Sequence, residues 1–261
     1  MNFMTTISEQ YMNEMHKQFQ YFATWEPGTE LHIGDIGELH DNKYTYISSL
    51  DKKKIPFTIR KDPSKNVLNY TSSSSIKVTT KLSGDVGIPK FNLSVADAGM
   101  TVEFGSEKGI VFEAEGVEHQ MIEEVDKLDQ TIKKKNGKKE WDDNWVVISD
   151  LMIADTATIL ISKGKKAAIS LKAKAEVPTL SLANVNANFD VAYQSGMNTK
   201  IISQSGLTPL FKARGIIVTW WGLGEKKVGP KERVGYMGGD ISPPSKPVKQ
   251  VVVKEIRYQP F

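Results

Sequence analysis

A strict two-residue alternation between residues 167 and 193 constrains the fold of this chain more than any other feature. From Ala167 to Val177 every odd-numbered residue is apolar, whereas the even-numbered residues include Ser170, Lys172 and Glu176. The stretch from Ala183 to Tyr193 repeats the rule, with asparagines between the apolar residues. Because successive side chains of a strand point to opposite faces, the pattern predicts long amphipathic strands.

Two kinds of structure share this pattern. One is an antiparallel sheet with one face on a core and the other face in water. The other is a strand pair that crosses a bilayer, for which roughly 9–11 alternating residues are enough. The alternation alone favours the ordinary sheet, since such sheets are far more common.

Two helices are expected beside the strands. Thr6 and Glu9 have the spacing of a capping box, and an apolar stripe follows them to Phe22. A second helix of about 17 residues is predicted between the two halves of the sheet. Its stripe consists of Val117, Met121, Ile122, Val125, Leu128 and Ile132.

Strand signals fill most of the remaining chain, and Lys163-Gly164-Lys165 has the chemistry of a hairpin turn. The predicted fold class is therefore α+β, with a twisted and mostly antiparallel sheet, long amphipathic strand pairs, an N-terminal helix and a mid-chain helix. The expected strands lie within residues 31–50, 55–60, 76–82, 92–104, 109–114, 145–153, 156–162, 167–177, 183–193, 199–203, 210–221 and 251–258.

Composition excludes several classes of function. The 34 basic and 31 acidic residues nearly balance, which argues against a dedicated nucleic-acid binder. The absence of cysteine excludes disulfides, cysteine nucleophiles and thiolate metal sites. No signal peptide is expected at the N-terminus, and no apolar run approaches the roughly 20 residues of a spanning helix.

The sequence offers little evidence of catalysis. It contains neither a His-Glu-x-x-His motif, nor a phosphate-binding loop, nor a Gly-x-Ser-x-Gly elbow. His32 and His40 share one strand parity and have Asp35 and Asp41 nearby, so a metal site there is an alternative to ordinary solvated residues. We therefore assign no catalytic residue, no metal and no cofactor.

The chain is expected to divide near residue 222. Residues 1–222 would form the α+β domain, and residues 223–261 a linker rich in glycine and proline that ends in a tail strand. That strand is expected to dock on a sheet edge. The docking residues would be Val251, Val253, Ile256 and Tyr258.

The order of these elements resembles that of a known family. The strand Asn144-Trp-Val-Val-Ile-Ser-Asp-Leu leads into the alternating segments, and Thr208-Pro-Leu-Phe-Lys-Ala-Arg-Gly-Ile-Ile-Val218 follows them. This layout, over about residues 5–220, resembles the pore-forming domain of gasdermins, particularly the compact bacterial ones. The resemblance implies that 76–82 with 93–104, and 156–162 with 167–191, refold into membrane hairpins.

The resemblance also implies roles for individual residues and partners. Lys163, Lys165 and Lys166 would lie at a hairpin tip, where anionic head groups attract them by about 1 kcal/mol per charge. The tail would keep the protein inactive in the cytoplasm until a protease releases it, and the active protein would form a homo-oligomer in the membrane. The lipid-facing residues would be Ile76, Val78, Leu82, Met100, Val102, Phe104, Ile159, Ile161, Ile169, Leu171, Val185, Phe189 and Val191.

Two other functions fit the same sequence. A soluble β-rich binding module for a protein or a small ligand, without membrane activity, would present a concave patch around exposed aromatic residues. An enzyme would show a pocket in which histidines or carboxylates converge.

Overall fold

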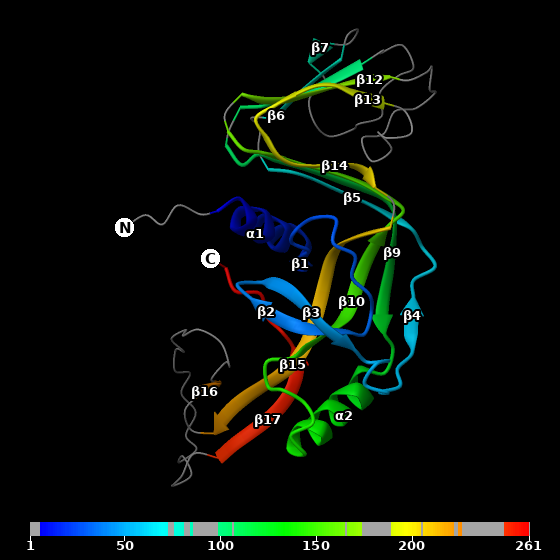
Figure 1. The fold of residues 1–261 in the computed structure, drawn as a ribbon, viewed down its shortest axis with the longest axis vertical. Coiled ribbons are helices and arrows are strands. Elements are labelled where there is room, and N and C mark those ends of the chain that lie inside the picture. The colour runs from blue at the N-terminus through cyan, green and yellow to red at the C-terminus, as the bar shows by residue number, and fades with distance from the viewer. Residues whose placement is uncertain are drawn as a thin grey trace, which may run out of the picture.

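The part of the chain that the structure describes forms two β-sheets and two helices, which confirms the predicted α+β class and its mostly antiparallel pairing (Figure 1). The computed structural model describes residues 6–72, 76–80, 84–85, 99–105, 107–164, 166–173, 189–204, 206–221, 224–225 and 248–260.

Helix α1 (Ile7–Phe19) begins at the predicted capping box. The Thr6 hydroxyl accepts a hydrogen bond from the Glu9 N–H, and the Glu9 carboxylate accepts one from the Thr6 N–H. The helix ends at Gln20, which has a left-handed backbone conformation. Its buried stripe packs on the long sheet, and the ring centroids of Phe19 and Phe112 lie 5.7 Å apart.

The mid-chain helix begins later than predicted. Residues 117–122 belong to β9 (Ile110–Ile122), and α2 spans Val125–Gly137. Only the last part of the predicted stripe, including Leu128 and Ile132, is helical and buried. The strand prevails over residues 117–122 because both of its edges are paired, one with β10 (Val146–Ala154) and the other with β4 (Ile59–Lys61). The apolar spacing there fits a strand and a helix equally well.

The long sheet contains 12 strands in the described part of the chain. Its central order is β1-β15-β10-β9-β11-β14, and the turn Asp41–Asn42 joins β2 to β3 at its side. Besides β4, β9 and β10, its strands are β1 (Phe22–Ala23), β2 (Asp35–His40), β3 (Lys43–Ser49), β5 (Asn66–Thr71), β11 (Thr156–Ser162), β14 (Met197–Gln204), β15 (Leu207–Trp221), β16 (Gly224–Glu225) and β17 (Val248–Glu255).

The second sheet, which we call the cap sheet, continues four strands of the long sheet. Its strands are β6 (Ile76–Thr80), β7 (Gly84–Asp85), β8 (Gly99–Phe104), β12 (Ala167–Ala173) and β13 (Phe189–Ser195), in the order β13-β12-β8-β6-β7. β5 leads into β6, β8 into β9, β11 into β12 and β13 into β14. We call β5, β6, β8 and β9 the first ribbon, and β11 to β14 the second ribbon.

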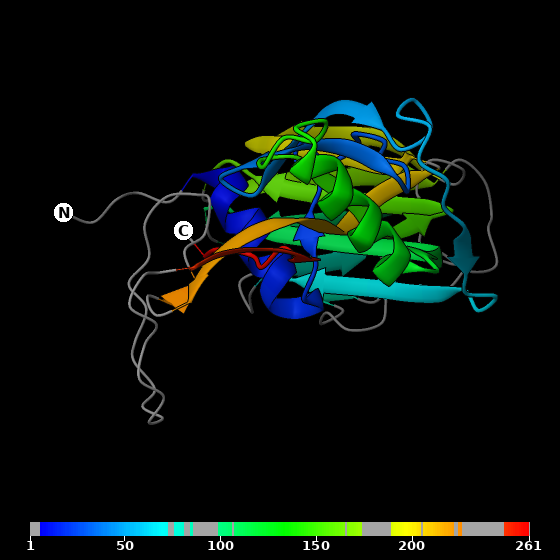
Figure 2. The ribbon, with the colours of Figure 1, turned by 90° about the horizontal axis from the view of Figure 1, so that it is seen from below.

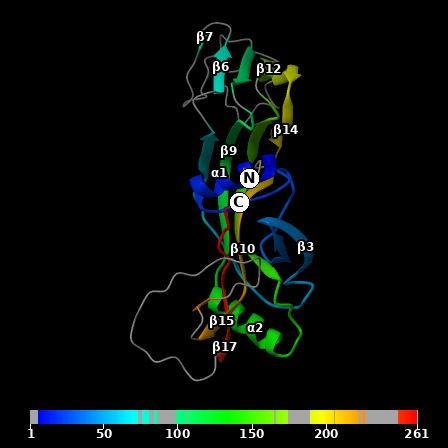
Figure 3. The same ribbon diagram turned by 90° about the vertical axis from the view of Figure 1, so that its left-hand side faces the viewer.

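Both ribbons bend at one place, which we call the corner. It is formed by Ser72, Lys108, Gly109, Ser162, Lys163, Gly164, Lys166 and Gly196. The cap sheet folds back from the corner over the long sheet, and the view toward the corner shows it at one end of the molecule (Figures 1 and 3). The strand order β5-β9-β11-β14 before the corner matches β6-β8-β12-β13 beyond it.

The predicted pairing of the second ribbon is therefore wrong. β11 does not pair with β12, since β11 pairs with β9 and β14 while β12 pairs with β8 and β13. Lys163 and Gly164 lie at the corner and not at a hairpin turn. The chain bends there without reversing to pair with itself. The neighbouring segment between β13 and β14 bends at the same corner, at Gly196. By contrast, the predicted pairing of 76–82 with 93–104 agrees with the ladder between β6 and β8.

Candidate functional site

The two ribbons run from the long sheet into the cap sheet, and their apolar side chains are buried in two different layers. Ile159 and Ile161 of β11 belong to the main core, which α1 covers. Ile169 of β12 is in phase with them along the sequence and is also fully buried, but it lies outside that core. In the first ribbon, Phe112 of β9 belongs to the main core, whereas Phe104 of β8, which has the same parity, is buried outside it. Residues of the same parity therefore face the main core before the corner and a different buried layer beyond it.

Hydrogen bonds between the ribbons form the corner. The Gly109 N–H donates to Ser162 Oγ at 2.7 Å, and the Ser162 N–H donates back to the Gly109 carbonyl at 2.9 Å. Beyond the bend, the Lys166 N–H donates to the Phe104 carbonyl at 3.0 Å. Gly196 has a φ of 63°, a left-handed conformation that glycine adopts without steric cost.

The position of Phe104 shows which face of the long sheet the cap sheet covers. A Cβ atom on Gly109 would lie 2.7 Å from the Phe104 ring and 3.3 Å from Ser162 Oγ. The ring therefore packs on the face of Gly109 and Ser162, which we call the back face and which is opposite to α1. The apolar side chains buried there, outside the main core, are Ile76, Val102, Phe104, Val111, Leu160, Ala167 and Ile169.

Polar side chains are buried on the same back face. Thr158 and Ser162 are 1% and 0% exposed, and Glu113 is 6% exposed. They alternate along β9 and β11 with the apolar residues that face α1. The apolar face of the cap sheet is therefore stacked on a partly polar face of the long sheet, and water is excluded from both.

The outer face of the cap sheet is polar. Lys77 and Glu103 are exposed, and the hydroxyls of Thr101 and Ser170 lie 2.9 Å apart in a hydrogen bond. The described side chains of β8 and β12 therefore form one apolar face and one polar face.

The structure describes the side chains of only some of the predicted lipid-facing residues. Ile76, Val102, Phe104 and Ile169 are buried between the sheets, as described above. Val78, Met100, Leu171, Phe189 and Val191 lie in cap-sheet strands, and their side chains are not described. Leu82 and Val185 lie outside the described residues. Lys163 and Lys166 are exposed at the corner and not at a tip, and Lys165 lies outside the description.

The C-terminal strand β17 forms a ladder with β15, from Arg214 opposite Glu255 to Trp221 opposite Val248. The predicted docking residues Val251, Val253 and Ile256 are half-buried against the main core. Tyr258 is 9% exposed and belongs to that core.

Tyr258 connects the tail to helix α1. Its ring stacks on His16 with 4.2 Å between ring centroids, and its hydroxyl donates to Asn13 Oδ1 at 2.8 Å. The backbone N–H of Gln259 also donates to Asn42 Oδ1 at 3.2 Å. Because α1 packs on β9 and β11, these contacts connect the tail to the ribbons through the helix (Figure 2).

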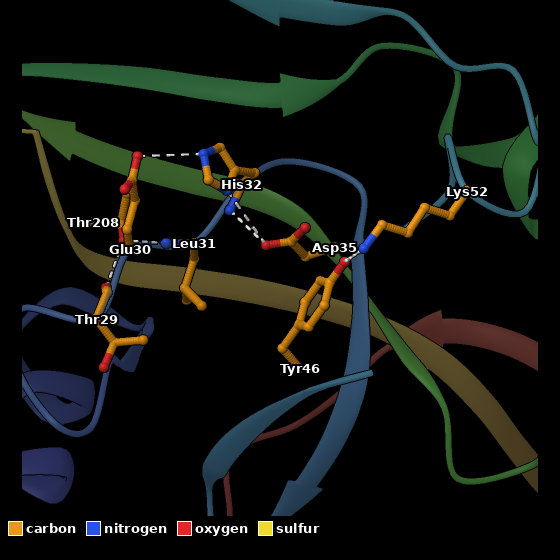
Figure 4. Close-up of polar contacts among 8 residues, drawn as sticks. All are labelled: Thr29, Glu30, Leu31, His32, Asp35, Tyr46, Lys52 and Thr208. Atoms are coloured by element: carbon orange, nitrogen blue, oxygen red, sulfur yellow. Dashed lines mark hydrogen bonds and ion pairs between the residues drawn. The ribbon is translucent and has the colours of Figure 1, made fainter. Parts of the chain in front are cut away.

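The structure does not bring His32 and His40 together. His32 lies in the turn before β2, with Nε2 3.3 Å from Glu30 and Nδ1 3.7 Å from Asp35 (Figure 4). His40 ends β2 and contacts Glu38 at 2.9 Å. Asp35 is buried, which raises its pKa, and the N–H of His32 opposes that shift by donating to it. In the described part of the chain, no three histidine or carboxylate side chains form a group that could hold a metal ion.

A shallow groove lies between α2 and the segment before β4. Its cavity volume is about 270 Å³, and its lining includes Phe57, Ile122 and Leu128 together with Glu124 and Lys127. No histidine lines it. The exposed large apolar residues lie on three strands, Tyr46 and Ile47 on β3, Ile59 on β4 and Val67 on β5, and none of them lines the groove. No helix among the described residues has the length and apolar character needed to cross a membrane.

Glu113 is the residue of this site that the sequence analysis missed. Its strand was expected from Ile110 and Phe112, and the alternation places Glu113 on the polar face. The alternation does not reveal that a second sheet covers this face. The strand β5, which pairs with β9 beside Glu113, is also absent from the strands expected from the sequence.

Comparisons with known proteins complete the description. No family model matches the chain, and no curated protein matches it. Among solved structures, the chain is similar to a bacterial gasdermin from Bradyrhizobium tropiciagri. The TM-score is 0.36 at 12% sequence identity, and the match covers 84% of this chain and 90% of the other.

Proposed function

We propose that this protein forms membrane pores by releasing its cap sheet from the long sheet and inserting the cap-sheet strands into the bilayer. One observation supports this proposal above all: the apolar face of the cap sheet is stacked on the polar-containing back face of the long sheet. Release of the cap sheet would hydrate Glu113, Thr158 and Ser162 and leave an apolar strand face that lipid can cover.

The exposed lysines of the corner set the depth of insertion in this proposal. Lys163 is in phase with the apolar face, and a lysine in contact with lipid costs about 2–4 kcal/mol at the midplane but about 0–1 kcal/mol near the interface. The corner is therefore placed at anionic head groups, with Lys163, Lys165 and Lys166 beside them. The alternation from Ala167 to Val177 then covers about the 9–11 residues that a spanning strand needs. In this arrangement Ile169 meets lipid, whereas Ile159 and Ile161 stay under α1.

The ribbons also provide edges for assembly. In the described part of the chain, β5 pairs only with β9 and β14 only with β11, so both outer edges are open. The strand directions alternate from β5 to β14, so β14 of one copy can pair antiparallel with β5 of the next. Head-to-tail pairing of this kind closes into a ring when the rotation between copies allows it.

The tail would control this step. Residues 1–222 are the pore-forming domain in the proposal, and residues 223–261 are an inhibitory segment that holds β15 and α1. A protease that cuts the segment between β16 and β17 would let the tail dissociate, and α1 would lose the contacts of Tyr258. The proposal assigns no catalytic residue, no metal, no cofactor and no nucleic-acid partner.

The experiment is dye release from vesicles. A specific protease site is inserted between residues 225 and 248 of the full chain, and gel filtration verifies that the cut tail dissociates. We expect the cut protein to release dye from vesicles containing an anionic lipid, and the intact protein to release none. Vesicles of zwitterionic lipid alone are the control for the role of the lysines. A cut protein that has lost its tail and still leaves anionic vesicles sealed would refute the proposal.

A further inference from the structure

Glu113 is a buried carboxyl group at the interface between the two sheets. It is the fourth residue of β9, with Asn69 of β5 and Thr158 of β11 as its register partners. Its side chain is on the back face, and the residue is 6% exposed. Its Oε2 atom has no hydrogen-bond partner among the residues that the structure describes. A carboxylate without such partners is strongly disfavoured in a buried position.

Among the residues that the structure describes, no group of opposite charge acts on Glu113. The charged group that acts on it is Glu115, which is two residues further along β9 and has the same sign. Lys77 and Glu103 of the cap sheet are exposed on its outer face. The described inward positions of the cap sheet, Ile76, Val102, Phe104, Ala167 and Ile169, are apolar. Burial raises the pKa of Glu113 from 4.5 to about 7, and the Glu115 carboxylate adds to the shift.

We propose that Glu113 is a proton-controlled latch between the sheets, which holds the cap sheet in place when protonated and favours its release when ionised. The proposal rests on the proposed function only for its consequence at a membrane. The latch itself requires no more than the stacking of the two sheets.

The direction of the effect follows from proton linkage. In the released state the carboxyl group is hydrated and titrates near its ordinary value, so the packed state binds the proton more tightly. Packing is therefore most stable at low pH and weakens as the pH rises from 4.5 to about 7. From the two pKa values, the equilibrium constant for opening should increase about 30-fold between about pH 5.5 and about pH 8.5.

Hydrogen exchange of the intact full-length protein tests the latch without a membrane. The readout is the protection of cap-sheet amides in β8 and β12, corrected for the intrinsic pH dependence of exchange. We expect protection to fall about 30-fold over that pH range in the wild type and to stay constant in Glu113→Gln. Glu103→Gln, on the outer face of the same sheet, should behave like the wild type. Glu115→Gln should move the transition to lower pH. Parallel pH profiles for the wild type and Glu113→Gln would overturn the proposal.

Vesicle leakage separates failure of the latch from failure of the proposed function. After the linker is cut, the wild type should release dye faster at about pH 8.5 than at about pH 5.5, and Glu113→Gln should be slow at both values. If exchange depends on Glu113 but no variant releases dye, the latch stands and the proposed function fails. If dye is released without any dependence on Glu113, the function stands and the latch is wrong.

Discussion

Gly109 and Ser162 exchange two hydrogen bonds at the corner, through the Gly109 N–H to Ser162 Oγ at 2.7 Å and the Ser162 N–H to the Gly109 carbonyl at 2.9 Å. The two residues belong to different ribbons. Because both ribbons turn here, the exchange couples their bends, and one ribbon cannot straighten while the other stays folded without breaking these bonds.

A side chain at Gly109 should loosen the cap sheet. The Cβ atom of Gly109→Ala would lie 2.7 Å from the Phe104 ring, so the ring must move from the back face. We expect a loss of about 1–3 kcal/mol in the free energy of unfolding, the usual range for overpacking. Thermal unfolding followed by circular dichroism measures it. Gly164→Ala is the matched control, since nothing lies within 4 Å of its Cβ position. Equal stability of the two variants would contradict the position of Phe104.

The face of each ribbon strand was predictable from the sequence, but the corner was not. Alternation is local, so the burial of Ile161 and Ile169 follows from a period of two. Whether those two residues share one layer depends on how four distant strands stack, and the residues Lys163 to Lys166 look like an ordinary turn. Residues 117–122 were misassigned for a related reason: their apolar spacing fits both a helix and a strand, and pairing with β4 and β10 decides between them.

Tyr258 should set how long the tail stays bound after the linker is cut. Tyr258→Phe keeps the stacking on His16 but removes the hydrogen bond to Asn13, which contributes about 0.5–1.5 kcal/mol. Tyr258→Ala also removes the buried ring, at a cost of about 3–5 kcal/mol. We expect tail dissociation, measured by the anisotropy of a dye on the tail, to accelerate in the order wild type, Phe, Ala. A tail that dissociates equally fast in all three proteins would show that this contact does not hold it.

The two faces of β12 should respond differently to polar residues in the leakage assay. Ile169 faces the long sheet and is fully buried, whereas Ser170 lies on the outer face beside Thr101. Ile169→Asn should abolish dye release by the cut protein, because it places an amide in lipid. Ser170→Asn should leave dye release within about twofold, since that face meets water.

Loss of folding is distinguished from loss of insertion by a label. The chain contains no cysteine, so a single cysteine can be introduced at residue 169 or 170 and coupled to an environment-sensitive dye. Once the tail is released, a quencher dissolved in the lipid should reach the dye at residue 169 and not at residue 170. The reverse pattern would place the polar face in lipid and contradict the proposed insertion.

The open edge of β5 should be required for assembly but not for folding. The Ser72 N–H donates to the Ile110 carbonyl at 3.0 Å, and hydrogen-bonded pairs alternate along an antiparallel ladder. The N–H of Asn69, three residues earlier, therefore points away from β9 toward the open edge. Asn69→Pro removes this N–H without breaking a bond to β9, a position at which edge strands tolerate proline.

We expect Asn69→Pro to lower the free energy of unfolding by no more than about 1 kcal/mol and to abolish dye release by the cut protein. Asn69→Ala keeps the N–H and should release dye like the wild type. Crosslinking of the cut protein on vesicles should give a ladder of oligomers for Asn69→Ala and monomers for Asn69→Pro. Pores formed by Asn69→Pro at the wild-type rate would exclude β5 as the edge that the next copy pairs with, and β14 would then have to meet a different strand.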